Sequence, residues 1–265
     1  MMDGHAELIR RISHLDAELG NHQINASSYA ELTHFTLVLA QIKSTGPISH
    51  VRSMPGLSPT DADALVAKSH RLARLLDAAP EVVAGPLRSD SQYWVGKGRP
   101  DFLPKSELTL RKSHFIGVPD LAAIEVSTKP FGIGLFTSTG VLGTYGMWRI
   151  YLDLNQGSTL YPLPWYTWAV QPHCRAVVCE IASASQWVEF VLSHPLRKDE
   201  LLFPDWRAVA RDYDAVHMTL RAIVSTQGLY FSTENGIVAA PYWDIESTLW
   251  LRWCFDSVSL VEAIA

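Results

Sequence analysis

Two carboxylates near the C-terminal end of the chain stand two positions apart in an otherwise apolar run. Residues 242–251 read YWDIESTLWL, so Asp244 and Glu246 lie among tryptophan, isoleucine and leucine side chains. In an extended strand, residues i and i+2 point to the same face, which predicts that both acids project from one side. Burying a charge is costly and usually goes with a partner or a use. The pair therefore indicates either a structural ion-pair site or a catalytic acid site.

A run of hydroxyl side chains ends a second predicted strand. Residues 135–139 read LFTST, so Thr137, Ser138 and Thr139 follow two apolar residues. Two glycines before the run permit close backbone approach. The segment is not a Rossmann fingerprint, because the third glycine would fall at Thr137, and it lacks the Gly-Lys-Ser/Thr end of a P-loop. We interpret it as a strand that presents hydroxyl groups.

A basic residue and an imidazole stand at the end of an earlier predicted strand. Residues 107–111 alternate polar and apolar side chains, as a half-buried strand does. Arg111 ends this strand and His114 follows it, where side chains can reach a cleft; a surface arginine and a capping histidine are the alternative. Further along, Tyr145 and Trp148 could hold a flat ring between them, or simply pack in the core.

Two other sets of reactive side chains lack the spacing that their chemistry needs. Ser138, His217 and Asp214 could be combined into a triad, but no Gly-x-Ser-x-Gly turn surrounds the serine. Two cysteines near His173 are spaced as C-x4-C, yet no fourth zinc ligand follows at a usual distance. We therefore predict neither a serine triad nor a metal site.

The elements that must position these residues fall into two regions. Apolar residues recur at helical spacing between residues 5 and 80, with a capping box that begins at Ser28. Residues 96–100 read GKGRP and are typical of a linker, and short strand-like runs follow it. Among the later segments, residues 185–192 and 205–211 are predicted as short helices and residues 213–218 as a buried strand. We predict an α+β chain, with a helical unit over residues 1–95 and a second domain over residues 100–265.

The composition indicates a globular chain with a substantial core. Of the 265 residues, 48% are hydrophobic and 18% are charged, and the net charge of -5 gives no sign of a phosphate-seeking surface. No run approaches the ~18 apolar residues of a membrane-spanning helix, and no signal peptide is evident. Three cysteines are too few for a disulfide framework. We expect a cytoplasmic protein without a membrane partner, although a toxin exported by a specialised apparatus would look the same.

Three of these pieces, in their order along the chain, resemble the ADP-ribosyltransferase superfamily. One class of that family carries an arginine, a Ser-Thr-Ser run and a Glu-x-Glu pair on successive strands. Here Arg111 or His114, the Thr-Ser-Thr run at 137–139 and the Asp-Ile-Glu of 244–246 follow in that order. The family's second class uses histidine and tyrosine, which His114 and Tyr145 would imitate.

A longer phrase adds to this resemblance. Residues 129–138 follow the pattern KPxGxGLxTS, which is similar to that of poorly characterised bacterial and phage proteins with this presumed fold. The likeness covers about residues 105–255. This chain departs from the family pattern at two places. It has Thr-Ser-Thr where the family has Ser-Thr-Ser, and Asp244 where the family has the first glutamate.

The resemblance implies a split mixed β-sheet whose cleft binds NAD as a substrate. Family members break the bond between nicotinamide and ribose through an oxocarbenium-like ribose, which a nearby carboxylate stabilises. Glu246 would accept a hydrogen bond from the ribose 2′-hydroxyl and supply that charge. Ser138 would orient Glu246 or the ribose, and Asp244 would position the acceptor nucleophile.

The resemblance also implies which residues contact the rest of NAD. Arg111 would neutralise a phosphate, or His114 would instead hold the adenosine ribose. Tyr145 or Trp148 would stack on nicotinamide. Thr137 and Thr139 flank Ser138 in the predicted NAD-binding run.

The expected activity is transfer of ADP-ribose to an unknown protein or nucleic acid, as in a toxin or defence effector. Such a toxin would be accompanied by an antitoxin or immunity partner. One alternative is an NAD glycohydrolase, in which water is the acceptor. Another is a non-catalytic module that uses the nine tryptophans to grip a peptide or a sugar.

Overall fold

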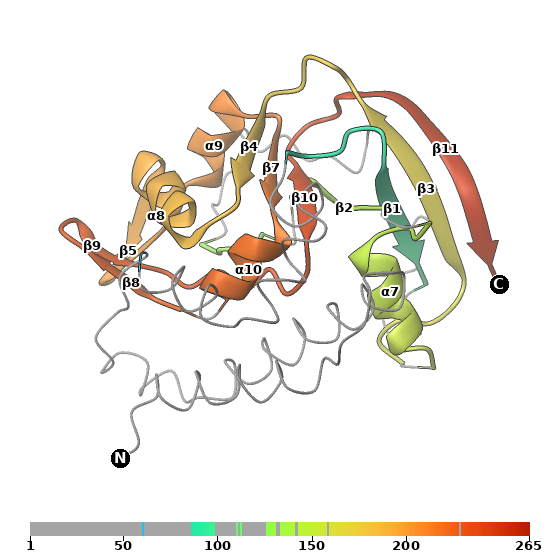
Figure 1. Ribbon diagram of the computed structural model, residues 1–265, viewed down its shortest axis with the longest axis horizontal. Helices are drawn as coiled ribbons and strands as arrows, with labels where there is room; N and C mark the ends of the chain where they lie inside the picture. Colours follow the sequence, from blue (N-terminus) through green and yellow to red (C-terminus); the bar gives the residue numbers. More distant parts are fainter. Residues whose placement is uncertain are drawn as a thin grey trace.

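The structure is a computed structural model that describes residues 60, 86–98, 110, 112, 126–130, 133–140, 143–157, 159–227 and 229–265 (Figure 1). This part of the chain is a mixed α+β fold in which sheet predominates. Apart from residues 60 and 86–95, the helical unit predicted over residues 1–95 lies outside the described residues, as do most of the predicted strand at 107–111, Arg111 and His114. The end of that unit, residues 92–95, is not helical but belongs to the strand β1 (Gln92–Lys97).

Two mixed β-sheets carry most of the described chain. The larger has seven strands in the order β11-β3-β1-β2-β10-β7-β4, and only β4 and β7 pair in parallel. The smaller has the order β5-β6-β9-β8, with β6 and β9 in parallel. The strands are β1 (Gln92–Lys97), β2 (Leu135–Thr139), β3 (Trp165–Pro172), β4 (Val178–Ile181), β5 (Pro195–Lys198), β6 (Leu201–Pro204), β7 (Ala215–Met218), β8 (Phe231–Thr233), β9 (Gly236–Val238), β10 (Ser247–Trp250) and β11 (Phe255–Ile264).

Helices pack beside these sheets, and polar side chains cap the first turns of three of the four described helices, α8, α9 and α10. In Figure 1, α8 and α9 lie to the left of β4 and β7, and α7 lies below β1 and β3. The side chain of Ser183 accepts a hydrogen bond at the start of α8, and that of Asp205 does so at the start of α9. The helices predicted at 185–192 and 205–211 are therefore confirmed. The helices of the described residues are α7 (Met147–Leu154), α8 (Ala184–Ser193), α9 (Trp206–Asp212) and α10 (Leu220–Thr226).

Tryptophan dominates the hydrophobic core. Five of the nine tryptophans are at most 2% exposed, namely Trp165, Trp187, Trp206, Trp243 and Trp250. The indole N–H of Trp187 donates to the carbonyl of Ala239 at 3.1 Å, and that of Trp206 to the carbonyl of Ser127 at 2.7 Å. A buried indole needs such a partner, so these rings are fixed parts of the core.

The strand predictions are only partly confirmed. β2 has the predicted bounds, and β7 lies within the predicted strand at 213–218. The prediction for residues 242–251 is wrong in its first half, because β10 begins only at Ser247 and Asp244 has a φ of 65°. This left-handed conformation interrupts the alternation of faces on which the prediction depended. The predicted linker is also wrong at its start, because Gly96 belongs to β1 and pairs with β3.

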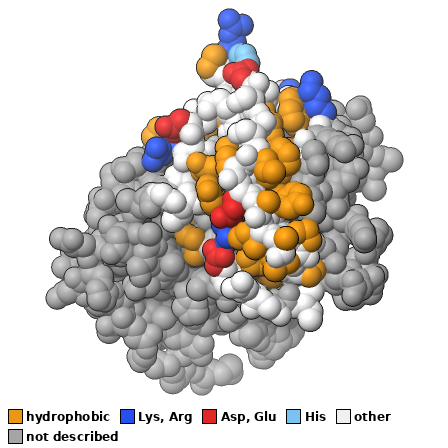
Figure 2. Space-filling model, turned by 90° about the vertical axis from the view of Figure 1, so that its right-hand side faces the viewer, with side chains coloured by type: hydrophobic (Ala, Val, Ile, Leu, Met, Phe, Trp, Pro, Cys, Tyr) orange, Lys and Arg blue, Asp and Glu red, His pale blue; other side chains and the backbone are white. Residues whose placement is uncertain are grey.

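The edge strand β11 is tied to α7 by charges. Arg149 of α7 pairs with Glu262 of β11 at 3.1 Å and with Asp153 of its own helix. This side of the molecule presents hydrophobic side chains around a small charged group (Figure 2), and Leu260 and Val261 of β11 are among the exposed ones. Among the described helices, none is both long and apolar enough to cross a membrane.

Candidate active site

A series of buried polar side chains crosses the larger sheet from β1 to β4. Cross-strand pairing explains it, because residues directly opposite each other share a face. Gln92 lies opposite Thr139, and Glu180 lies opposite His217. The series, which we call the polar network, consists of Gln92, Thr137, Thr139, Glu246, His217 and Glu180.

The centre of the polar network is the carboxylate of Glu246, which is 0% exposed. Its Oε2 accepts a hydrogen bond from the backbone N–H of Thr139 at 3.0 Å, and its Oε1 accepts one from the Thr139 hydroxyl at 2.8 Å. Nε2 of His217 lies 2.9 Å from the same Oε1. The carboxylate is thus held from two neighbouring strands, which satisfies a buried charged group.

The threonines of β2 have an ordered set of donors and acceptors. Thr139 donates its only hydroxyl proton to Glu246 and accepts a hydrogen bond from Nε2 of Gln92 at 2.8 Å. Thr137 donates to Oε1 of Gln92 at 2.6 Å and accepts from the indole N–H of Trp250 at 2.8 Å. Because each proton has one acceptor, this network fixes the orientation of Glu246.

His217 links Glu246 to a second carboxylate. Its side chain is 3% exposed, and its Nδ1 lies 2.5 Å from Oε1 of Glu180. Burial lowers the pKa of His217, but the hydrogen bonds to Glu180 and Glu246 and the charges of both carboxylates outweigh burial and raise the pKa to about 9. His217 is therefore an imidazolium at neutral pH. Glu180 is 28% exposed, so the polar network reaches solvent at this end.

Ser138 contacts the backbone of Glu246 rather than its carboxylate. Its hydroxyl donates to the Glu246 carbonyl at 3.2 Å and accepts from the backbone N–H of Trp148 at 3.3 Å. Gly146 directly precedes α7 and has a φ of 87°. Its backbone lies so close to β2 that an added Cβ would stand 2.6 Å from Cβ of Ser138. Ser138 thus joins α7 to the backbone of Glu246, while the Glu246 carboxylate is contacted by Thr139, which was predicted only as a neighbour of Ser138 in the NAD-binding run.

Asp244 has surroundings different from those of Glu246. Its Oδ1 accepts a hydrogen bond from Nε2 of Gln227 at 2.8 Å. Burial raises the pKa of Asp244, against the opposing charge of Lys129 and the hydrogen bond from Gln227. The prediction that the two acids lie side by side on one strand face is wrong, since they contact separate groups.

Lys129, from the phrase KPxGxGLxTS, is a buried cation beneath Asp244. Its ammonium donates to the carbonyl of Trp243 at 2.5 Å and lies 5.3 Å from the ring centre of Phe136. Burial lowers the pKa of Lys129 to about 8, partly offset by the charge of Asp244. Through the Trp243 carbonyl and the Phe136 ring, Lys129 connects the turn before β10 to β2, the strand that carries the hydroxyl run.

The two aromatic residues predicted to hold nicotinamide have separate ring partners. Trp148 stacks on Tyr151 with ring centres 5.1 Å apart and an angle of 12°. Tyr145 contacts Tyr93 edge to face at 5.2 Å. The hydroxyl groups of Tyr151 and Tyr161 lie 3.0 Å apart.

The aromatic group of Trp148, Tyr151 and Tyr161 lies near Asp244. Burial, the hydrogen bond and charge of Tyr161, and the charge of Asp244 all raise the pKa of Tyr151. Trp148 also donates its backbone N–H to Ser138, which contacts Glu246. The aromatic group therefore connects the surroundings of the two acids.

Sequence reasoning missed the imidazole of the polar network. It considered His217 only with Ser138 and Asp214, and that triad does not form. The carboxylate of Asp214 accepts from the backbone N–H of Val177 at 2.8 Å, while both ring nitrogens of His217 face glutamates. Its neighbours follow from the order of strands in the sheet, for which the sequence holds no local signal.

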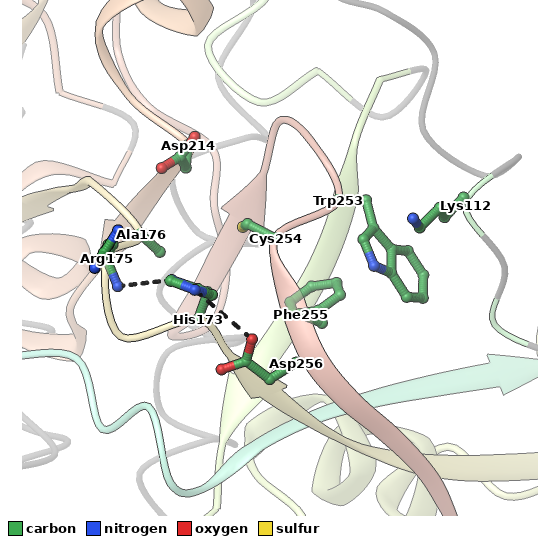
Figure 3. Close-up of a pocket in the computed structure, with 9 residues that line it drawn as sticks. All are labelled: Lys112, His173, Arg175, Ala176, Asp214, Trp253, Cys254, Phe255 and Asp256. Carbon is green, nitrogen blue, oxygen red and sulfur yellow. Dashed lines mark hydrogen bonds and ion pairs between the residues drawn. The ribbon is translucent and has the colours of Figure 1, made fainter.

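A pocket of about 300 Å³ lies elsewhere, at the loop between β3 and β4 and the turn before β11 (Figure 3). None of the predicted site residues that the structure describes lines it. Its walls include an ion pair between His173 and Asp256, with 3.9 Å between Nε2 and Oδ1, and the ring of Trp253. The polar network is thus a separate candidate site, and its central carboxylate is closed to solvent in this structure.

Comparisons with protein-family models, with curated proteins and with solved structures give no match for this chain.

Proposed function

We propose that this chain is an NAD-consuming enzyme of the ADP-ribosyltransferase type. It cleaves the bond between nicotinamide and ribose and transfers ADP-ribose to a protein or nucleic acid. The observation that carries the proposal is the contact between the hydroxyl run of β2 and Glu246, with 2.8 Å between the Thr139 hydroxyl and the carboxylate. Thr139 and Glu246 are 107 residues apart in sequence, and their order along the chain does not require them to meet.

The chemistry needs a fixed negative charge beside the ribose. As neutral nicotinamide leaves, positive charge develops on the ribose ring, and a pre-oriented carboxylate stabilises it without reorganising. In the proposal, Glu246 supplies this charge and receives the ribose 2′-hydroxyl, while Thr139 holds its orientation. Asp244 would position the acceptor nucleophile, which bonds to the anomeric carbon as the bond to nicotinamide breaks and releases its proton to solvent.

The dinucleotide would enter on the side of the aromatic group formed by Trp148, Tyr151 and Tyr161. This group connects the surroundings of Asp244 with those of Ser138. Because Glu246 is 0% exposed, the proposal requires that the cover over its carboxylate opens before the ribose can reach it.

The test is incubation of labelled NAD with the purified chain and cell extracts. Label on protein or nucleic acid supports transfer. The substitution Glu246→Gln should lower the rate of transfer ~10²-fold or more. The matched control is Glu234→Gln, which removes an exposed carboxylate from the turn between β8 and β9 and should keep full activity. Thermal unfolding of each variant must show a folded protein.

The same assay separates the alternatives. Free nicotinamide without labelled polymer would mean that water is the acceptor, and the enzyme would be a glycohydrolase. If the wild-type chain consumes no NAD with any extract, both enzymatic readings are refuted. If Glu246→Gln keeps wild-type activity while folded, the role given to this carboxylate is wrong.

A further inference from the structure

We infer that His217 is a positioning residue for Glu246, and that Glu180 supplies a second negative charge to the same group. The inference rests on the proposed function as far as catalysis is concerned. The charge that it assigns to His217 is argued from the contacts of both ring nitrogens and can be tested without NAD.

The contacts of the imidazole determine its protonation. Nδ1 lies 2.5 Å from Glu180 and Nε2 lies 2.9 Å from Glu246. An ionised carboxylate only accepts hydrogen bonds, so both ring nitrogens must donate, and only the imidazolium does this. A neutral ring would leave one nitrogen lone pair facing a carboxylate oxygen, unless one of the acids held a proton.

The imidazolium gives the buried carboxylate of Glu246 an opposite charge. A buried charged group needs such a partner. His217 is the cation bonded to this carboxylate, and it approaches from β7, opposite to Thr139 on β2.

Glu180 sets the net charge of the polar network. One imidazolium and one carboxylate would be neutral together, whereas two carboxylates around the same imidazolium leave one net negative charge. That remaining charge is what an oxocarbenium-like ribose would meet. Because Glu180 is 28% exposed on β4, it can be changed with little effect on the core.

A further observation places unused hydrogen-bonding capacity beside this group. Thr248 lies directly opposite both His217 on β7 and Thr137 on β2, so its side chain shares their face. It is 0% exposed, and its hydroxyl has no hydrogen-bond partner in the described part of the chain. Such an unsatisfied group in a native core marks a place for function or for a bound water. One ring nitrogen of His217 thus contacts the Glu246 carboxylate, and the residue directly opposite His217 is Thr248, whose hydroxyl has no partner among the described residues.

The experiment compares the wild type with Glu180→Gln and His217→Gln, using NMR of isotope-labelled histidine and nicotinamide release from pH 6 to 10. We expect the His217 signal of the wild type to be that of an imidazolium at pH 7. We expect kcat to fall as the pH rises through about 9, where His217 loses its charge. Glu180→Gln should lower kcat about tenfold with little change in KM, and His217→Gln should lower it further.

The outcomes are distinguishable. His173→Gln, which changes an exposed imidazole outside the polar network, should keep the wild-type pH profile. A neutral His217 at pH 7 would overturn the inference, and so would a Glu180→Gln variant with an unchanged kcat and pH profile. If His217→Gln does not fold, Glu180→Gln and the NMR titration still decide. If the wild type releases no nicotinamide, the proposed function fails, and the NMR titration alone decides the charge of His217.

Discussion

Raising the pH should destabilise the fold in a window set by His217. The pKa of this imidazole is about 9 in the folded chain against 6.5 for a free histidine. The folded state therefore binds more protons than the unfolded state between these values, and stability falls as the pH rises. A difference of about 2.5 pKa units corresponds to about 3 kcal/mol, which is fully present below pH 6.5 and lost as the pH rises through 9.

Lys129 limits the window in which this effect can be seen alone. Its pKa is lowered to about 8 from 10.5, so the unfolded state binds more protons between these values and stability rises with pH there. Between pH 6.5 and 8 the effect of His217 dominates. We expect the free energy of unfolding to drop by about 1 to 2 kcal/mol across this interval.

Urea unfolding at several pH values between 6.5 and 8, followed by tryptophan fluorescence, measures this slope. His217→Gln should remove the slope, because glutamine has no proton to lose. His173→Gln, at an exposed position, should keep it. A wild-type stability that is flat or rises over this window would refute the reasoning, as would an equal slope in His217→Gln.

Three further predictions concern the elements that hold the site. Thr139→Val should destabilise the fold by about 2 kcal/mol or more in urea unfolding, because two buried partners lose their hydrogen bonds, while Thr139→Ser should cost clearly less; equal losses would contradict the network. Gly146→Ala should lower the free energy of unfolding by about 3 kcal/mol, because a Cβ there would meet Ser138. The control is Gly143→Ala: Gly143 has a similar φ of 80°, but no described atom lies within 4 Å of an added Cβ, so the loss should be only about 1 kcal/mol. Lys129→Met should make the fall of stability between pH 8 and 10.5 steeper, measured as the thermal midpoint, because the Lys129 contribution rises with pH and offsets part of the fall caused by the raised pKa values of His217, Cys179 and Cys254; a pH dependence equal to that of the wild type would contradict the buried cation.

The sequence could predict elements whose signals are local. β2 was predicted as a strand ending in hydroxyl residues, β7 as a buried strand and α9 as a helix, and in the structure the side chain of Asp205 caps the first turn of α9. It could not predict α7. That helix follows the left-handed Gly146, and its aromatic residues hid the helical period.

The candidate site shows the same limit. The meeting of β2 with Glu246 was expected from a resemblance, and the contact through Thr139 instead of Ser138 needed coordinates. Nothing in the sequence placed Asp244 in a left-handed turn, where it contacts Gln227. The neighbours of a residue across a sheet depend on strand order, which is set by the whole fold and not by spacing along the chain. The roles given to Arg111 and His114 stay predictions.

The most direct test of the central claim is an experimental structure of crystals soaked with NAD. We predict that the Glu246 carboxylate lies within hydrogen-bond distance of the 2′-hydroxyl of the nicotinamide ribose, with the Thr139 contact preserved. A dinucleotide bound elsewhere, with Glu246 still enclosed between Thr139 and His217, would contradict the account.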